Sequence, residues 1–200
     1  MFLDPEAPIA TCIRPSCENC ALASRLHCHF NDKDLGAFLA SVMPAFILGG
    51  IGLYRFGVWP FGLWVAFSLS YFGLIEIRVM CSHCPHYAEE GNSLKCWANY
   101  GSPKPWRYRP GPMSRAETVI FLAGLAFIFG YPAAVFLWTS QWLWAALEIV
   151  FVIAFFARTE AGMCNRCMNF NCPLNRVDQA TRLAFLKQNP LLEEARKREA

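Results

Sequence analysis

Residues 35–54, LGAFLASVMPAFILGGIGLY, run for 20 positions without a charged side chain. A helix of roughly 20 apolar residues crosses the hydrocarbon core of a bilayer, which is about 30 Å thick. Three further stretches have the same character, at about residues 58–75, 118–138 and 142–157. None of them alternates apolar and polar residues as the strands of a membrane β-barrel do. The sequence therefore predicts an all-α integral membrane protein with four transmembrane helices in contact with the lipid bilayer.

The composition agrees with this fold class. The chain is 55% hydrophobic and only 16% charged, whereas a soluble domain carries about 25% charged residues. The sequence contains no nucleotide-binding glycine loop, no H-E-x-x-H pair and no G-x-S-x-G turn. Nucleotide-driven and hydrolytic activities therefore have no support from known motifs.

Short connections divide the chain into two helical hairpins and three cysteine-rich segments. Few residues separate the first span from the second near Arg55, or the third from the fourth near Thr139. We expect an N-terminal segment (1–33), a hairpin (34–80), a loop (81–116), a second hairpin (117–157) and a C-terminal segment with amphipathic helices (158–200). Because each hairpin returns the chain to the side it started from, all three cysteine-rich segments share one side of the membrane.

The basic residues predict which side that is. Seventeen of the 18 Lys and Arg residues lie in or beside the three cysteine-rich segments, and only Arg55 lies at the opposite end. By the positive-inside rule, that side and both termini are cytoplasmic. Topology alone explains the basic residues, so they give no reason to expect nucleic-acid binding.

The two halves of the chain resemble each other at an offset of 83 residues. Phe46 maps to Phe129 and Trp59 to Trp142, although matches between apolar helices arise easily by chance. The two C-x-x-C pairs carry more weight, because Cys81 maps to Cys164 and Cys84 to Cys167. We therefore predict a duplicated hairpin, with a parallel repeat about an axis along the membrane normal. Independent convergence of two similar hairpins is the alternative.

All ten cysteines fall in the cysteine-rich segments and none in a span. They form three groups: Cys12, Cys17, Cys20 and Cys28; Cys81, Cys84 and Cys96; Cys164, Cys167 and Cys172. In a reducing cytosol such groups indicate metal ligands or redox-active thiols more than structural disulfides. His83 and His86 lie beside the second group and are candidate additional ligands.

The spacing of the cysteines leaves the metal open. The first group, C-x4-C-x2-C, resembles plant-type ferredoxins in ligand spacing alone. Two C-x-x-C pairs are also able to supply a tetrahedral zinc site. We expect segments of this size to be too short to build a core of their own, for which a structural zinc is a common remedy. We expect an iron–sulfur cluster or zinc, with free thiols as the third alternative.

Two features outside the cysteine groups are candidate cofactor contacts. Glu148 is a carboxylate inside the fourth predicted span, where ionisable groups are costly and often functional. The alternative is a structural carboxyl bonded to Ser68, Ser70 or Tyr71. Trp106, Arg107 and Arg109 interleave an aromatic ring with cations beside the third span, which suits an anionic cofactor or lipid head group. The alternative is an interfacial strap.

These observations favour a membrane-anchored electron-transfer protein. One or two cysteine-ligated centres would exchange electrons with a quinone or with a membrane or soluble redox partner protein. The alternatives are a zinc-stabilised scaffold or assembly factor, a metal-handling protein and a thiol–disulfide enzyme. The sequence does not identify a substrate, and whether the protein is an enzyme stays open.

Overall fold

A computed structural model describes residues 19–28, 30–89, 91–190, 193–194 and 197 of the chain. All the regular secondary structure of the described residues is helical. They contain no β-strand, and one isolated β-bridge joins Ser93 and Pro103. The α-helices are α1 (Asp32–Phe56), α2 (Val58–Ser70), α3 (Glu76–Val79), α4 (Arg115–Trp138), α5 (Trp142–Thr159) and α6 (Gln179–Gln188). The described residues also form two π-helical turns, η1 (Tyr71–Ile75) and η4 (Glu160–Cys164). Two 3₁₀ turns, η2 (Cys81–His83) and η3 (Pro85–Tyr87), follow α3.

Among the residues that the structure describes, four helices are long and apolar enough to cross a membrane, which confirms the predicted spans. They cover Asp32–Phe56, Val58–His83, Arg115–Trp138 and Trp142–Cys164. The second and fourth are longer than predicted, because each passes through a π-helical turn and reaches the first cysteine of a C-x-x-C pair. At the hairpin ends, Trp59 and Trp138 are about nine-tenths exposed, as suits aromatic rings at a membrane interface.

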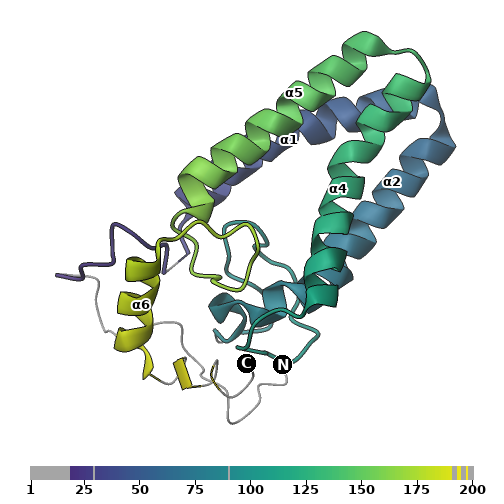
Figure 1. The fold of residues 1–200 in the computed structure, drawn as a ribbon. Helices are drawn as coiled ribbons and strands as arrows, with labels where there is room; N and C mark the ends of the chain where they lie inside the picture. The colour runs from purple at the N-terminus through teal and green to yellow at the C-terminus, as the bar shows by residue number, and fades with distance from the viewer. Residues whose placement is uncertain (1–18, 29, 90, 191–192, 195–196, 198–200) are drawn as a thin grey trace.

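The helices form two pairs that meet at the hairpin ends (Figure 1). α1 packs along α5, and α2 lies beside α4. At the other end the pairs separate, and the loop between the hairpins, α6 and the segment before α1 lie together there (Figure 1). The three cysteine-rich segments, where the structure describes them, therefore share one end of the bundle.

α1 and α4 begin with equivalent capping interactions. The Asn31 side chain accepts a 2.9 Å hydrogen bond from the backbone N–H of Asp34, and the Ser114 hydroxyl accepts one of 3.2 Å from that of Glu117. The Glu117 carboxylate also accepts from the backbone N–H of Ser114, which completes a capping box. Each residue of the first cap lies 83 positions before its counterpart in the second.

The same offset recurs where the two hairpins touch. The rings of Phe46 and Phe129, which are 83 positions apart, have centroids 5.6 Å from each other. Within the hairpins, Phe46 packs on Phe72 at 6.3 Å, and Phe129 packs on Phe155 at 5.2 Å. A Cβ added to Gly49 would lie 3.2 Å from the ring of Pro132, its own counterpart. Such contacts between equivalent positions are expected if the two hairpins are related by a two-fold axis.

Pro132 explains one long-range hydrogen bond in the bundle. Proline has no N–H, so the carbonyl four residues earlier, that of Ile128, loses its helical partner. The indole Nε1–H of Trp64 donates to that carbonyl at 2.8 Å. Because lipid offers no replacement donor, this bond lets the helix keep a proline inside a membrane span.

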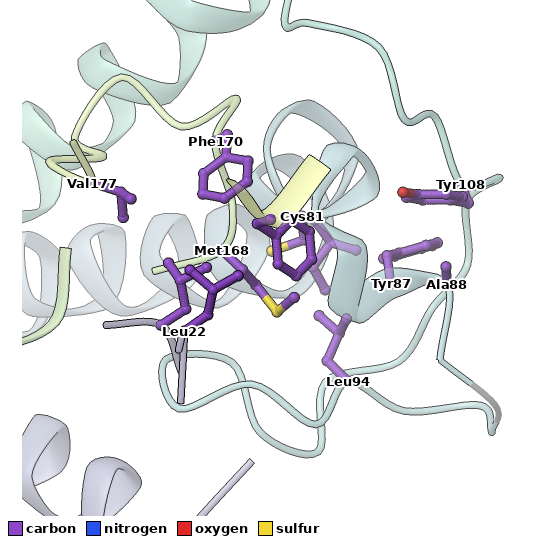
Figure 2. Close-up of a cluster of buried hydrophobic side chains, with 12 residues drawn as sticks. Leu22, Cys81, Tyr87, Ala88, Leu94, Tyr108, Met168, Phe170 and Val177 are labelled. Carbon is purple, nitrogen blue, oxygen red and sulfur yellow. The ribbon is translucent and has the colours of Figure 1, made fainter. Parts of the chain in front are cut away.

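The extramembrane segments share one hydrophobic core (Figure 2). Its buried side chains come from all three: Leu22 and Leu26 precede α1, Tyr87, Leu94 and Tyr108 lie between the hairpins, and Met168, Phe170, Val177 and Phe185 follow α5. We expected these segments to be too small for a core because each was taken alone. Together, the three segments supply the side chains of one shared core.

Gly124 offers a test of the packing between α2 and α4. A Cβ at this position would lie 1.8 Å from the Tyr71 ring, whose hydroxyl donates to the Phe121 carbonyl at 2.6 Å. We predict that Gly124→Ala destabilises the protein by about 1–3 kcal/mol, as overpacked sites do. Thermal unfolding in detergent measures the change.

The control is Gly130→Ala on the same helix, where an added Cβ meets nothing within 4 Å. It should leave the melting temperature unchanged or slightly raised, because alanine favours helix over glycine. Equal melting temperatures for the two variants would contradict the packing described here.

Candidate functional site

Six cysteines line one cavity beneath the separated ends of the helix pairs. They are Cys81, Cys84, Cys96, Cys164, Cys167 and Cys172. The cavity has a volume of about 160 Å³ and is lined by residues from both hairpins. Two of the three cysteine groups predicted from the sequence therefore meet at one place.

The ends of the second and fourth spans deliver the two C-x-x-C pairs to the cavity. Cys81 begins the 3₁₀ turn η2 directly after α3, and Cys164 ends the π-helical turn η4 after α5. Cys84 and Cys167 follow three residues later, where the chain has left the helix. Cys96 and Cys172 return to the cavity from the loops beyond.

Backbone N–H groups a few residues ahead lower the pKa of four of these thiols. His86 acts on Cys84, and Asn169 acts on Cys167. Ala98 and Asn99 act on Cys96, and Leu174 and Asn175 act on Cys172. Such turns hold each side chain in a fixed direction, and their N–H groups favour the thiolate, the form that binds metals.

Burial opposes ionisation of these four thiols. Burial raises the pKa of Cys84 and of Cys167 well above the usual value, and neighbouring cysteines raise it further. A negative charge on Cys96 raises the pKa of both thiols, and a charge on Cys167, from the other hairpin, also raises the pKa of Cys84. Burial raises the pKa of Cys172 to about 12. Several thiolates would coexist here only with a positive charge among them.

The side of the cavity toward the membrane is apolar and holds one carboxyl group. Phenylalanines from α1, α4 and α5 form most of this wall, and Glu76 of α3 lies among them. Glu76 is only 5% exposed, and its Oε2 atom has no hydrogen-bond partner. The Asn99 side chain bonds to Glu76 and donates to the Cys81 sulfur at 3.3 Å, which links the carboxyl to the cysteines.

The structure separates the two predicted histidine ligands. His86 lines the cavity, and its Nδ1 pairs with Glu89 Oε1 at 2.8 Å, an interaction that orients many metal-binding histidines. His83 does not line it. Its Nε2 lies 2.6 Å from Arg109 Nη2 and its Nδ1 2.8 Å from the Gly111 carbonyl. Because arginine only donates, Nε2 accepts and Nδ1 carries the proton, so both nitrogens are engaged.

The predicted cofactor contacts on the loop form a strap across the helix ends. Arg109 pairs with Glu117 of α4, and its backbone N–H donates to the Ser82 carbonyl at 2.7 Å. Trp106 donates through Nε1 to the Leu74 carbonyl at 3.3 Å. Arg107 is exposed, and none of the three residues lines the cavity. Their contacts match the interfacial-strap interpretation.

Glu148 lies away from the cavity, inside the bundle. It is 1% exposed, and its Oε1 would lie 3.2 Å from a Cβ added to Gly49. Its Oε2 has no partner, and the three partners considered from the sequence do not supply one. Ser70 and Tyr71 donate to the backbone carbonyls of Ala66 and Phe121, and the Ser68 hydroxyl is itself without a partner. A cofactor contact at Glu148 stays a prediction.

The N-terminal cysteine group is described only in part. Cys20 and Cys28 pack against the extramembrane core and do not line the cavity. Cys12 and Cys17 lie outside the described residues. A metal site formed by these four cysteines therefore stays a prediction.

Among the described residues, no three Cys, His, Asp or Glu side chains converge closely enough to hold one metal ion. Four sulfurs around one zinc would lie about 3.8 Å apart, given a Zn–S bond of about 2.3 Å in a tetrahedron.

Sequence reasoning missed the polar residues that accompany the cysteines. In the sequence, Glu76 is only a charged residue at the end of the second predicted span, yet it lies in the cavity wall. Asn99 and Asn175 each lie three residues after a cavity cysteine, so the spacing C-x-x-N occurs at Cys96 and again at Cys172. That repeated spacing is the signal that would have identified them.

Compared with known proteins, the chain matches no protein-family model, no curated protein and no solved structure.

The raised pKa values predict how the thiols react. In reduced protein dialysed against a chelator, the fraction of Cys172 present as thiolate at pH 8 is about 1 in 10⁴, because its pKa is about 12. Alkylation by iodoacetamide, followed by peptide mass spectrometry, should modify the partly exposed Cys20 first. Cys84, Cys167 and Cys172 should react only as the pH rises or in denaturant. Equal rates for all four thiols at pH 8 would contradict the buried cavity.

Proposed function

We propose that the cysteine cavity binds an iron–sulfur cluster and that the protein transfers electrons at the membrane surface. The observation that carries this proposal is the meeting of six cysteines, three from each half of the chain, around one enclosed space of about 160 Å³. Thiolates select zinc, copper(I) and iron–sulfur clusters among metals. Cluster-bound iron supplies the positive charge that several neighbouring thiolates require.

The volume of the site favours a cluster over a single zinc ion. A cluster contains several iron and sulfide atoms, so its cysteine ligands stand farther apart than those of one ion. The cavity, with a volume of about 160 Å³, has room for such a group of atoms.

We infer that Cys84, Cys96, Cys167 and Cys172 are the ligands. These are the four thiols whose pKa is lowered by nearby backbone N–H groups, and hydrogen bonds from such groups tune the reduction potential of iron–sulfur clusters. Two come from each half of the chain, so the cluster would also hold the two halves together. A second centre on Cys12, Cys17, Cys20 and Cys28 is a separate proposal that awaits its own test.

The location favours electron transfer with a membrane partner. Residues of α1, α4 and α5 bound the cavity on its membrane side, so a metal centre in the cavity would lie next to the bilayer surface. A soluble donor would reach the cysteine side, and a quinone or membrane protein would accept electrons from the helix side. By the positive-inside rule, the cysteine side is cytoplasmic.

We also infer that the two hairpins arose by duplication. The helix caps, the phenylalanine contacts and the C-x-x-C pairs share the offset of 83 residues. An ancestral dimer with one C-x-x-C pair per hairpin would have placed these cysteines around its two-fold axis, where the cavity now lies.

Serine substitutions test the ligand assignment. In protein purified anaerobically in detergent, Cys84→Ser, Cys96→Ser, Cys167→Ser and Cys172→Ser should each lose most of the cavity's iron and acid-labile sulfide. Cys81→Ser and Cys164→Ser should retain the cluster with a changed visible spectrum. If Cys81 and Cys164 are the ones whose loss removes iron, the ligand assignment is wrong and the two C-x-x-C pairs hold the cluster.

Cys20→Ser is the matched control outside the cavity. It should leave the cavity cluster and its spectrum intact, and any fall in iron would report a second centre on the N-terminal group. Colourless protein that contains one zinc per chain would instead support the zinc-stabilised scaffold and overturn the electron-transfer proposal.

Labelling from outside the cell tests the orientation. Gln141 is exposed in the connection between α4 and α5, at the end of the bundle opposite the cavity. We predict that Gln141→Cys reacts with a membrane-impermeant maleimide on intact cells. The parent protein should stay unlabelled until the membrane is permeabilised. Labelling of the parent protein on intact cells would place the cysteine side outside the cytoplasm.

A further inference from the structure

A second hollow lies on the outer side of the bundle, between α4 and α5. It has a volume of about 400 Å³, and only apolar residues of these two helices line it. Leu122 and Ile153 in its wall are 41% and 62% exposed, so it opens on the surface that faces lipid. A groove of this kind suits a hydrocarbon chain.

The groove and the cysteine cavity share one wall. Leu125, Phe129 and Phe156 line both spaces. An elongated molecule that lies in the groove therefore needs to displace only these apolar side chains to reach the cavity. The two spaces together form an apolar route from the lipid to the region beside the cysteines.

The cavity end of this route holds polar partners for a small head group. Glu76 is buried, lines the cavity and leaves its Oε2 without a hydrogen-bond partner. A carboxyl group in that position either donates to a carbonyl oxygen or accepts from a hydroxyl. Most of the other residues on the membrane side of the cavity are phenylalanine, leucine and valine, which suit an aromatic ring, and Thr159 adds a hydroxyl group.

We propose that a lipid-soluble quinone binds across these two neighbouring spaces, with its ring beside Glu76 and its hydrocarbon tail in the groove between α4 and α5. The proposal rests on the proposed function, because the choice of a redox-active ring follows from a redox centre at the cysteines. A quinone fits both ends of the site: its carbonyl oxygens match the unpartnered carboxyl, and its long apolar tail matches the groove.

The reaction at this site is a balanced reduction. With a cluster held by the cavity cysteines, two electrons from a soluble one-electron donor would reach the quinone one at a time. The two quinone carbonyl oxygens take up two protons from water on the cysteine side and become hydroxyl groups. The resulting quinol leaves through the groove into the bilayer.

Binding to the purified protein in detergent tests the site without depending on electron transfer. Titration calorimetry with a decyl-substituted benzoquinone and with the same ring lacking a tail compares the two ends of the site. Ala126 lines the groove and not the cavity. We predict that Ala126→Phe weakens binding of the decyl compound at least tenfold and leaves binding of the tail-free ring unchanged.

Two further variants complete the experiment. Ala134→Phe places the same side chain on an exposed part of α4 outside the groove and should change neither affinity. Glu76→Leu should weaken both compounds at least tenfold, whereas Glu76→Gln, which keeps a hydrogen-bonding group, should retain most of the affinity. Thermal unfolding checks that each variant is folded.

The outcomes separate the site from the proposed function. If the protein contains the cluster but the decyl compound does not bind, or binds equally to Ala126→Phe, the quinone site is wrong and the electron-transfer proposal stands. If the quinone binds to protein without iron and sulfide, the site stands and the proposed redox centre is wrong. Displacement of the quinone by phosphatidylglycerol at equal concentration would make the groove a phospholipid site and overturn the proposal.

Discussion

The gathering of six thiols around one cavity, three of them buried and three partly buried, is the constraint on which the rest of this structure depends. Neutral thiols pack well among apolar side chains, but thiolates in the same place are costly because burial and mutual repulsion both disfavour charge. Burial and neighbouring cysteines accordingly raise the pKa of Cys84 and Cys167. The backbone N–H groups near four of the sulfurs have the opposite effect. This combination suits a site completed by a cationic centre.

The rest of the fold brings these sulfurs together from distant parts of the chain. Contacts such as Phe46 with Phe129 join the hairpins, while the helix pairs separate toward the cysteine end. The π-helical turns extend the second and fourth spans to Cys81 and Cys164. The strap through Arg109 ties the loop between the hairpins to α4, and the shared extramembrane core fixes the segments beyond. Trp106 and Arg109, predicted as cofactor contacts, bond to Leu74 and Glu117 in this strap, and a cofactor contact there stays a prediction.

The sequence predicted the parts of the fold that depend on local physics. Length and hydropathy identify the four spans, because a bilayer imposes a minimum length on any uncharged helix. The register of the C-x-x-C pairs indicated that Cys84 and Cys167 belong together. Long-range packing was not predictable: the shared core forms only when three distant segments meet. The separation of His83 from His86 depends on the Arg109 strap, and Glu76 enters the cavity because a π-helical turn precedes it.

The composition of the native centre tests the central claim most directly. Protein purified anaerobically in detergent should be brown, with a visible absorption that bleaches on reduction and with iron and acid-labile sulfide in equal amounts. That result would establish a cluster among the cysteines and direct attention to its electron partners. Colourless protein without sulfide, whether it carries zinc or no metal, would contradict the account and leave the six cysteines with a structural or thiol-exchange role.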